Sequence, residues 1–308
     1  MKRVICVVGP TATGKTELAV RLAQALDGEV VSCDSMQVYR DMPIGTAQPT
    51  PEEQKGIPHH MLAVADPAEA FSVGKFVAQA DPIVQDILAR GKTAILAGGT
   101  GLYVDALAAG RSFAPTPRTG RREALEARAD REGIEALLAD LRRVDPQSAA
   151  RLHPGNRRRI IRALEVFEAT GIPFSKQAEH EAADDGLTWR VVSTAMERPA
   201  LYDRINQRVT AMIRQGLKDE VERLLSEGVP PGAQSMSGLG YKEMIPCIRG
   251  EYSLEEAADR IRLGTRHYAK RQMTYLKKEA EITYVRTEAP DAYDQIRKAL
   301  TEGDRKGI

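Results

Sequence analysis

The feature that most constrains this chain is a glycine-containing segment close to its N-terminus. The segment matches the pattern G-x-x-x-x-G-K-[ST]; it follows an apolar run at residues 4–8 and precedes residues 17–26, whose leucines recur at helical spacing. A buried strand, a glycine turn and a helix, in that order, are the context in which a phosphate-binding loop forms. The predicted loop consists of Gly9, Pro10, Thr11, Ala12, Thr13, Gly14, Lys15 and Thr16.

This loop predicts that the chain binds a diphosphate or a triphosphate. Its backbone N–H groups and the N-terminus of the following helix attract phosphate, Lys15 adds a positive charge, and the Thr16 hydroxyl is the expected Mg²⁺ ligand. An enzyme that hydrolyses NTP should also carry an apolar strand that ends in a magnesium-binding Asp. The strand predicted at Thr93–Ala97 leads instead into two glycines. This difference favours a kinase or other diphosphate chemistry over hydrolysis.

Apolar runs that alternate with amphipathic segments predict an α/β fold with a parallel sheet flanked by helices, as in P-loop NTPases. Residues 115–188 have helical patterns and no strand candidate, so we expect an all-helical domain inserted into the core. The core would comprise residues 1–114 and 189–308, consistent with a chain of 308 residues. We expect strands at residues 4–8, 30–32, 93–97, 189–195 and 282–285, and long helices over 200–225 and 254–276.

Composition limits the classes of partner. A formal net charge of +1 gives no overall attraction to nucleic acid, so an RNA site must be a local patch. No apolar run reaches the roughly 18 residues that span a membrane, so we expect no membrane association. The 3 cysteines are far apart in the sequence, which predicts neither a zinc site nor a disulfide framework and suits a reducing cytoplasm. We expect the protein to be a monomer.

Asp34 is the candidate catalytic carboxylate. It follows the second predicted strand, and ligands of parallel sheets bind beyond the carboxyl ends of the strands. We therefore expect Asp34 to face the same crevice as the phosphate-binding loop, where it could accept a proton from a nucleophile or help to hold magnesium. Because Asp-Ser pairs also cap turns, a purely structural role remains open.

Eight short motifs follow one another in a specific order along the chain. They are residues 9–16, 34–39 (DSMQVY), 44–47 (IGTA), 58–60 (PHH), 98–103 (GGTGLY), 201–208 (LYDRINQR), 238–243 (GLGYKE) and 268–272 (YAKRQ). In this order they resemble the tRNA dimethylallyltransferases (tRNA isopentenyltransferases) from end to end, and the absence of the zinc finger of eukaryotic members points to the bacterial type. Gln48 stands where many members have Lys, and Tyr275 where many have Trp.

The resemblance implies a reaction and roles for three residues. A dimethylallyl group would pass from dimethylallyl diphosphate to the N6 amine of the adenosine 3′ of the anticodon in tRNA, and pyrophosphate would leave, with Mg²⁺ as cofactor. Asp34 would be the general base, Thr100 would bond near the diphosphate oxygens, and Arg208 would neutralise the leaving pyrophosphate. Arg204 lies four residues earlier on the predicted helix and shares its face. Ionisation of the allylic donor and direct displacement both remain possible.

Local positive charge predicts where tRNA binds. Residues 146–164 and 261–278 contain no acidic side chain, which fits phosphate contacts with an anticodon stem-loop, although helices also carry cationic faces for solvation alone. Residues 237–242 predict a flexible loop that clasps an unstacked base, since the target adenosine must flip out to reach Asp34. The expected tRNA contacts are Asp34, Ser35, Met36, Gln37, Thr100, Gly101, Arg158, Arg159, Ile160, Ile161, Arg162, Gly238, Gly240, Tyr241 and Lys242.

Three other functions compete with this hypothesis. The same chemistry could act on a free adenine nucleotide, a kinase could bind ATP at the loop, or a non-catalytic RNA-binding protein could use the loop as a nucleotide sensor. The basic helical insertion argues against the first, and the last leaves Asp34 and Thr100 without a role. His59 and His60 have no metal-ligand spacing around them, so we expect them to be structural.

Overall fold

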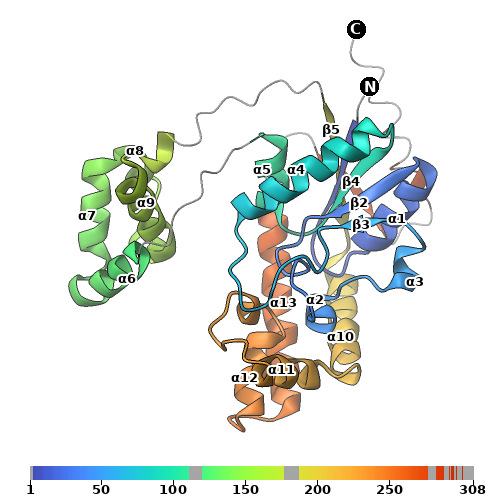
Figure 1. Ribbon diagram of the computed structural model, residues 1–308. Helices are drawn as coiled ribbons and strands as arrows, with labels where there is room; N and C mark the ends of the chain where they lie inside the picture. Colours follow the sequence, from blue (N-terminus) through green and yellow to red (C-terminus); the bar gives the residue numbers. More distant parts are fainter. Residues whose placement is uncertain are drawn as a thin grey trace. The chain divides into compact units, whose positions relative to one another are not determined.

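The computed structural model describes residues 3–110, 120–176, 187–276 and 282–287, together with residues 291, 293, 294, 296 and 300. The chain divides into two compact units: Met1–Ala108 with Asp184–Ile308, and Ala109–Ala183 (Figure 1). The predicted boundary at residues 114/115 lies outside the described residues, and the predicted boundary at 188/189 lies at the start of a strand.

The larger unit is built on one sheet whose six strands all run parallel. The order across the sheet is β3-β2-β4-β1-β5-β6, which confirms the predicted fold class. The edge strand β3 was not predicted, because two residues are too few to show a hydrophobic period. The strands are β1 (Arg3–Val8), β2 (Gly28–Ser32), β3 (His59–His60), β4 (Thr93–Ala97), β5 (Thr188–Ala195) and β6 (Ile282–Arg286).

Of the long helices predicted for the larger unit, the one over residues 254–276 is confirmed with the bounds Leu254–Leu276. The single helix expected over residues 200–225 is wrong: it breaks into two helices at Gly216, whose φ of 94° ends one helix and starts the next. The helices are α1 (Lys15–Ala25), α2 (Pro43–Thr46), α3 (Pro51–Gln54), α4 (Val73–Ala89), α5 (Gly101–Ala108), α10 (Arg198–Arg214), α11 (Leu217–Ser226), α12 (Tyr241–Ile248) and α13 (Leu254–Leu276).

Both faces of the sheet are buried, which explains the continuous apolar runs of its strands. In β1, Val4 and Cys6 point into a core that includes α4 and α5, whereas Ile5 and Val7 point to the opposite face and pack with Leu18 of α1. Helices α10, α11, α12 and α13 lie next to one another and complete the first of these cores (Figure 1). No described helix is long and apolar enough to cross a membrane.

The smaller unit is a helical bundle with a core of its own. Helices α6 and α7 pack against α9, and the apolar side chains between them form a separate buried cluster. Strands are absent from the described part of this unit, as predicted. The helices are α6 (Arg121–Glu132), α7 (Ile134–Val144), α8 (Pro146–Ala150) and α9 (Arg157–Thr170).

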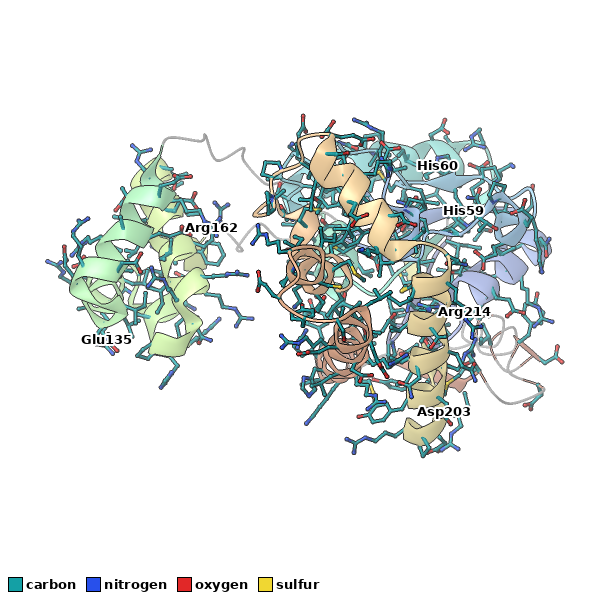
Figure 2. All side chains as sticks on the ribbon, turned by 90° about the horizontal axis from the view of Figure 1, so that it is seen from below. His59, His60, Glu135, Arg162, Asp203 and Arg214 are labelled. Atoms are coloured by element: carbon teal, nitrogen blue, oxygen red, sulfur yellow. The ribbon has the colours of Figure 1, made fainter. Side chains whose placement is uncertain are left out.

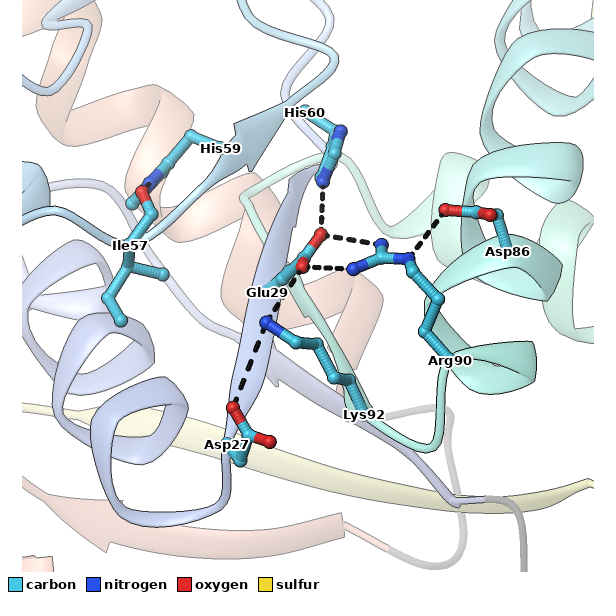
Figure 3. Close-up of polar contacts among 8 residues, drawn as sticks. All are labelled: Asp27, Glu29, Ile57, His59, His60, Asp86, Arg90 and Lys92. Atoms are coloured by element: carbon cyan, nitrogen blue, oxygen red, sulfur yellow. Dashed lines mark hydrogen bonds and ion pairs between the residues drawn. The ribbon is translucent and has the colours of Figure 1, made fainter.

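A buried carboxylate, Glu29, lies near the start of β2 and is surrounded by polar partners (Figure 3). Arg90 donates to both of its oxygens, at 2.5 and 2.9 Å, and Lys92 and His60 add contacts of 3.2 and 2.8 Å. The Arg90 guanidinium holds the pKa of Glu29 well below its usual range, against the opposing effect of burial. The Glu29 cluster therefore joins β2 to β3, α4 and β4 by charge-assisted hydrogen bonds.

We predict that Glu29→Gln lowers the free energy of unfolding at pH 7 by about 2 kcal/mol. This is less than the roughly 3–5 kcal/mol for breaking a fully buried pair, because Arg90 and Lys92 remain partly hydrated. A carboxylate with a depressed pKa stabilises the fold above its unfolded pKa of about 4.3 and loses that contribution as the pH falls. Urea unfolding should therefore show the two proteins converging below about pH 4.

Asp86→Asn is the matched control for this test. Asp86 also bonds Arg90, but its side chain is 67% exposed, so its loss should cost under about 1 kcal/mol. Equal destabilisation by the two variants at pH 7 would contradict the central role of Glu29.

Candidate active site

The phosphate-binding loop lies between β1 and α1, as its sequence context predicts. Gly9 (φ 144°) and Gly14 (φ 83°) adopt backbone conformations that favour glycine. A Cβ on Gly9 would lie 2.2 Å from Thr194 Oγ1, so the loop is pressed against β5. The buried Thr13 hydroxyl donates to Pro10 O at 2.7 Å and lies 2.6 Å from Thr194 Oγ1. Contacts within the protein thus fix the conformation of the loop.

Three cationic side chains converge on this loop. The Lys15 ammonium donates to Pro10 O at 2.6 Å. Arg208, on α10, donates from Nη1 to Thr11 Oγ1 at 3.3 Å, and Arg204 lines the same cavity one turn earlier on that helix. The shared helix face expected for the two arginines is therefore turned toward the loop.

The close approach of these cations alters their acid–base properties. Burial lowers the pKa of the Lys15 ammonium to about 8; Asp34 opposes the shift and Arg208 adds to it. Burial also lowers the pKa of Arg208, and the neighbouring Arg204 contributes. Mutual repulsion between cations is relieved when an anion binds among them, so the site has the electrostatics of an anion site.

Asp34 follows β2 and has two different carboxylate oxygens. Oδ1 accepts the N–H groups of Met36 and Gln37 at 2.9 and 3.4 Å, so it does cap a turn. Oδ2 has no hydrogen-bond partner among the residues that the structure describes, and Asp34 lines the cavity. The Thr100 hydroxyl lies beside this turn, accepting the Ser35 N–H at 3.0 Å and lying 3.3 Å from Ser35 Oγ. Turn capping thus orients the carboxylate and leaves one oxygen available.

One cavity of about 640 Å³ connects the loop with Asp34, a size that suits a small ligand together with part of a second one. Residues from the ends of β2 and β4, from α10 and from α13 share its lining, as the topology of parallel sheets predicts. The predicted site residues that line it are Thr11, Ala12, Gly14, Lys15, Thr16, Asp34, Gln37 and Arg208.

Gly238 and Gly101, which were expected to contact tRNA, are not among the residues that line this cavity. Gly238 packs against Met36, since a Cβ on Gly238 would lie 2.5 Å from Met36 Cε. Gly101 packs in the same way against Tyr275, whose hydroxyl donates to Asp105. The glycines at these positions therefore serve close packing of α5, α13 and the turn after β2.

The flexible loop expected at residues 237–242 is wrong. Tyr241 begins α12 and is fully buried, so it cannot stack on a base. Its hydroxyl donates to Glu220 Oε1 at 2.7 Å and lies 3.1 Å from Met42 O. Gly240 precedes the helix with φ 98°, and the adjacent Lys242 is exposed and 3.6 Å from Glu243. Within residues 237–242, Ser237 and Lys242 are the exposed residues.

In the helical insertion, the residues of α9 that were expected to contact tRNA differ in their exposure. Ile160 and Ile161 are buried in the core of the bundle, so the direct tRNA contact expected for them is wrong. Arg158 and Arg159 are exposed on α9. Arg162, labelled in Figure 2, is partly exposed. Its guanidinium pairs with Glu165 at 2.8 Å. The helical period separates the apolar and basic residues of this segment onto two faces.

Two residues lining the cavity had received no cavity role from the sequence. Gln272 of α13 accepts the N–H of Thr11 at 2.9 Å and donates to Gly99 O at 3.0 Å. His59, on β3, donates from Nδ1 to Ile57 O at 2.8 Å, and its buried Nε2 has no partner among the described residues. Gln272 belongs to the motif at residues 268–272, but the resemblance implied no role for it. No spacing pattern in the sequence identifies Gln272 or His59 as a residue that lines the cavity.

Comparisons with known proteins agree with this geometry. The model of the family "IPP transferase" matches residues 37–279, and that of "Isopentenyl transferase" matches residues 2–66. A tRNA dimethylallyltransferase 1 from Trichlorobacter lovleyi is 48% identical over 284 residues, covering 92% of this chain and 93% of the relative.

The chain is also similar in structure to solved members of this group of transferases. A full-length tRNA isopentenylpyrophosphate transferase from Bacillus halodurans superposes with a TM-score of 0.72 at 40% identity, over 99% of both chains. A eukaryotic dimethylallyltransferase acting on tRNA superposes with a TM-score of 0.84 at 27% identity, over 99% of this chain and 79% of that one.

The shifted ammonium of Lys15 generates a prediction about pH. Because Lys15 must be protonated to attract an anion, the affinity for pyrophosphate should fall as the pH rises through about 8. Lys15→Met should bind more weakly at pH 7, and the difference from the wild type should shrink by pH 9.5. Calorimetric titration of both proteins checks this, since their difference cancels the ionisation of pyrophosphate itself. Lys242→Met, at an exposed position, should match the wild type throughout; a constant Lys15→Met deficit would contradict the prediction.

Proposed function

The chain belongs to the IPP transferase family, and on that basis we propose that it transfers a dimethylallyl group from dimethylallyl diphosphate to the N6 amine of the adenosine 3′ of the anticodon in tRNA. It is a transferase, as are its named relatives. The observation that carries the assignment to particular residues is one cavity lined by the phosphate-binding loop, Arg208 and Asp34. A donor anion and an acceptor amine could meet there.

The donor's diphosphate would lie in the loop as a leaving group. Lys15, Arg204 and Arg208 would neutralise the charge that develops as pyrophosphate departs, which is the kind of electrostatic help that lowers barriers most. This role explains why the site concentrates cations, whereas β4 leads into two glycines and lacks the terminal acid that would support hydrolysis.

Thr16 would hold Mg²⁺ together with oxygens of the diphosphate. Its position in the cavity beside Lys15 fits this role, and Mg²⁺ characteristically combines few protein ligands with substrate phosphates. No three His, Cys, Asp or Glu side chains among the described residues form a metal cage. When bound, Mg²⁺ would offset the negative charge of the diphosphate oxygens.

Asp34 would act as the general base for the acceptor. An adenine amine is a poor nucleophile because its lone pair is delocalised into the ring, so removal of its proton assists attack. The Oδ1 contacts to Met36 and Gln37 would hold the carboxylate while Oδ2 accepts the proton. Thr100, which bonds the neighbouring Ser35, would keep this turn in place and bond near the diphosphate.

The helical insertion would bind the anticodon stem-loop through its exposed arginines. Arg158 and Arg159 have no acidic partner among the described residues, whereas Arg157 pairs with Asp130 at 2.6 Å. Arginines without an internal partner are the ones whose binding to phosphate releases counterions.

Incubation with labelled dimethylallyl diphosphate and either tRNA or AMP tests the function as a whole. We expect label on tRNA alone. Label on AMP would favour a free-nucleotide acceptor, and phosphoryl transfer from ATP to a small molecule would favour a kinase.

Two Asp34 variants separate the base from the turn cap. Asp34→Asn keeps an oxygen for the Met36 and Gln37 N–H groups but cannot take a proton, whereas Asp34→Ala loses both functions. We expect Asn to lower kcat by about 10²–10⁴-fold, as for loss of a general base. tRNA affinity should stay within about tenfold, because phosphate contacts dominate it. Near-normal turnover of Asp34→Asn would leave Asp34 with only its structural role.

Salt dependence tests the insertion. Arg158→Ala/Arg159→Ala should weaken tRNA binding and reduce the slope of log K against log salt by about 1.5, since each phosphate contact contributes about 0.7–0.9. The matched control is Arg131→Ala/Arg142→Ala, which removes the same charge from exposed positions on α6 and α7. Equal slopes for the two double variants would show only a general charge effect and would remove α9 from the RNA interface.

A further inference from the structure

Gln272 connects the two segments of the site that must act on different substrates. It lies near the C-terminal end of α13 and is only 7% exposed. Its Oε1 accepts the N–H of Thr11 at 2.9 Å, and its Nε2 donates to Gly99 O at 3.0 Å. Thr11 belongs to the phosphate-binding loop, and Gly99 immediately precedes Thr100. One carboxamide thus spans the donor side and the acceptor side of the cavity.

The fit around this carboxamide is close. A Cβ on Gly99 would lie 2.1 Å from Gln272 Nε2, so the side chain approaches the backbone as nearly as a glycine allows. The site requires one acceptor and one donor at the end of a side chain with two methylene groups. Glutamate offers no donor at neutral pH, and methionine has similar length but neither strong donor nor strong acceptor. The chemistry of Gln272 is therefore matched to both of its partners.

The residue one turn earlier on α13 supports the same arrangement. Burial raises the pKa of Tyr268, and the Asp34 carboxylate adds to the rise, so the phenol stays protonated at neutral pH. Hydrogen bonds with the side chains of Thr100 and Gln272 act in the opposite direction, which places the phenol beside both. Helix α13 thus presents two polar side chains, at positions 268 and 272, to the acceptor side of the site.

We propose that Gln272 is a positioning residue that sets the distance between the diphosphate in the loop and the acceptor amine at Asp34. It does so by fixing Thr11 relative to Gly99, and hence the loop relative to Thr100 and its contact with Ser35. This inference rests on the transferase function proposed above. A reacting geometry that is loose by about 1 Å can cost about 100-fold in rate, so the carboxamide affects turnover without touching a reacting atom.

The test compares Gln272→Met with the wild type at saturating donor and tRNA. We expect kcat to fall by about 10–100-fold. Pyrophosphate affinity should change by less than about threefold, because the cations and loop amides that bind the anion remain. The amide hydrogens of Thr11 and its neighbours should exchange faster in the variant, a readout independent of activity. Thr274→Ala, at an exposed position on the same helix, is the control and should retain wild-type kcat.

The outcomes separate this inference from the function on which it rests. A wild-type protein that transfers nothing to tRNA overturns both. An active wild type with an unimpaired Gln272→Met variant overturns only the positioning role, as does a variant whose lower activity is explained entirely by a smaller folded fraction. Should Gln272→Met fail to fold, Gln272→Glu carries the same comparison of kcat, because it keeps the acceptor for Thr11 and loses the donor to Gly99.

Discussion

The site depends on the contact between the phosphate-binding loop and β5. Gly9 leaves no room for a side chain against Thr194, and the hydroxyls of Thr13 and Thr194 meet at 2.6 Å in a buried position. Thr194 also donates to Val8 O at 3.2 Å, so it bonds the strand that leads into the loop. These partners are 181 or more residues apart in sequence, on opposite sides of the insertion. The loop can therefore adopt this conformation only when the chain segments before and after the insertion have paired in the sheet.

From this fixed loop the charges of the site follow. Lys15, Arg204 and Arg208 are held near one another although they repel, and the lowered pKa values of Lys15 and Arg208 record part of the cost. Such electrostatic repulsion is compatible with a functional site where a bound anionic ligand offsets it. The opposite arrangement occurs at Glu29, where three cationic or polar partners surround one carboxylate and the charges satisfy each other internally. The first cluster is suited to binding, the second to stability.

The parts of the structure that sequence could predict are those set by short-range rules. The loop, the strand-end position of Asp34 and the helix Leu254–Leu276 each follow from a local pattern and a known topology. The break at Gly216 was missed because an isolated glycine is compatible with a continuous helix until tertiary packing decides. Ile160 was misassigned although its apolar helical spacing predicts burial. The role of Gln272 depends on partners far away in sequence, which no motif encodes.

Tyr241 shows how a motif can serve a site without entering it. Its ring occupies the space that a Cβ on Gly45 would need, at 2.4 Å, and its hydroxyl bonds the buried Glu220. The same Glu220 carboxylate accepts the N–H groups of Ile44 and Gly45 at 2.9 and 3.0 Å. Ile44 lines the cavity. The hydrogen bonds of Glu220 therefore fix the position of a residue in the cavity lining without entering the cavity. The residues 44–47 and 238–243, which the sequence presents as separate motifs, are two halves of one packed contact. An aromatic residue beside a glycine is compatible with a flexible loop that clasps a base and also with a rigid contact that supports the cavity. Only the burial of the aromatic side chain distinguishes these two roles.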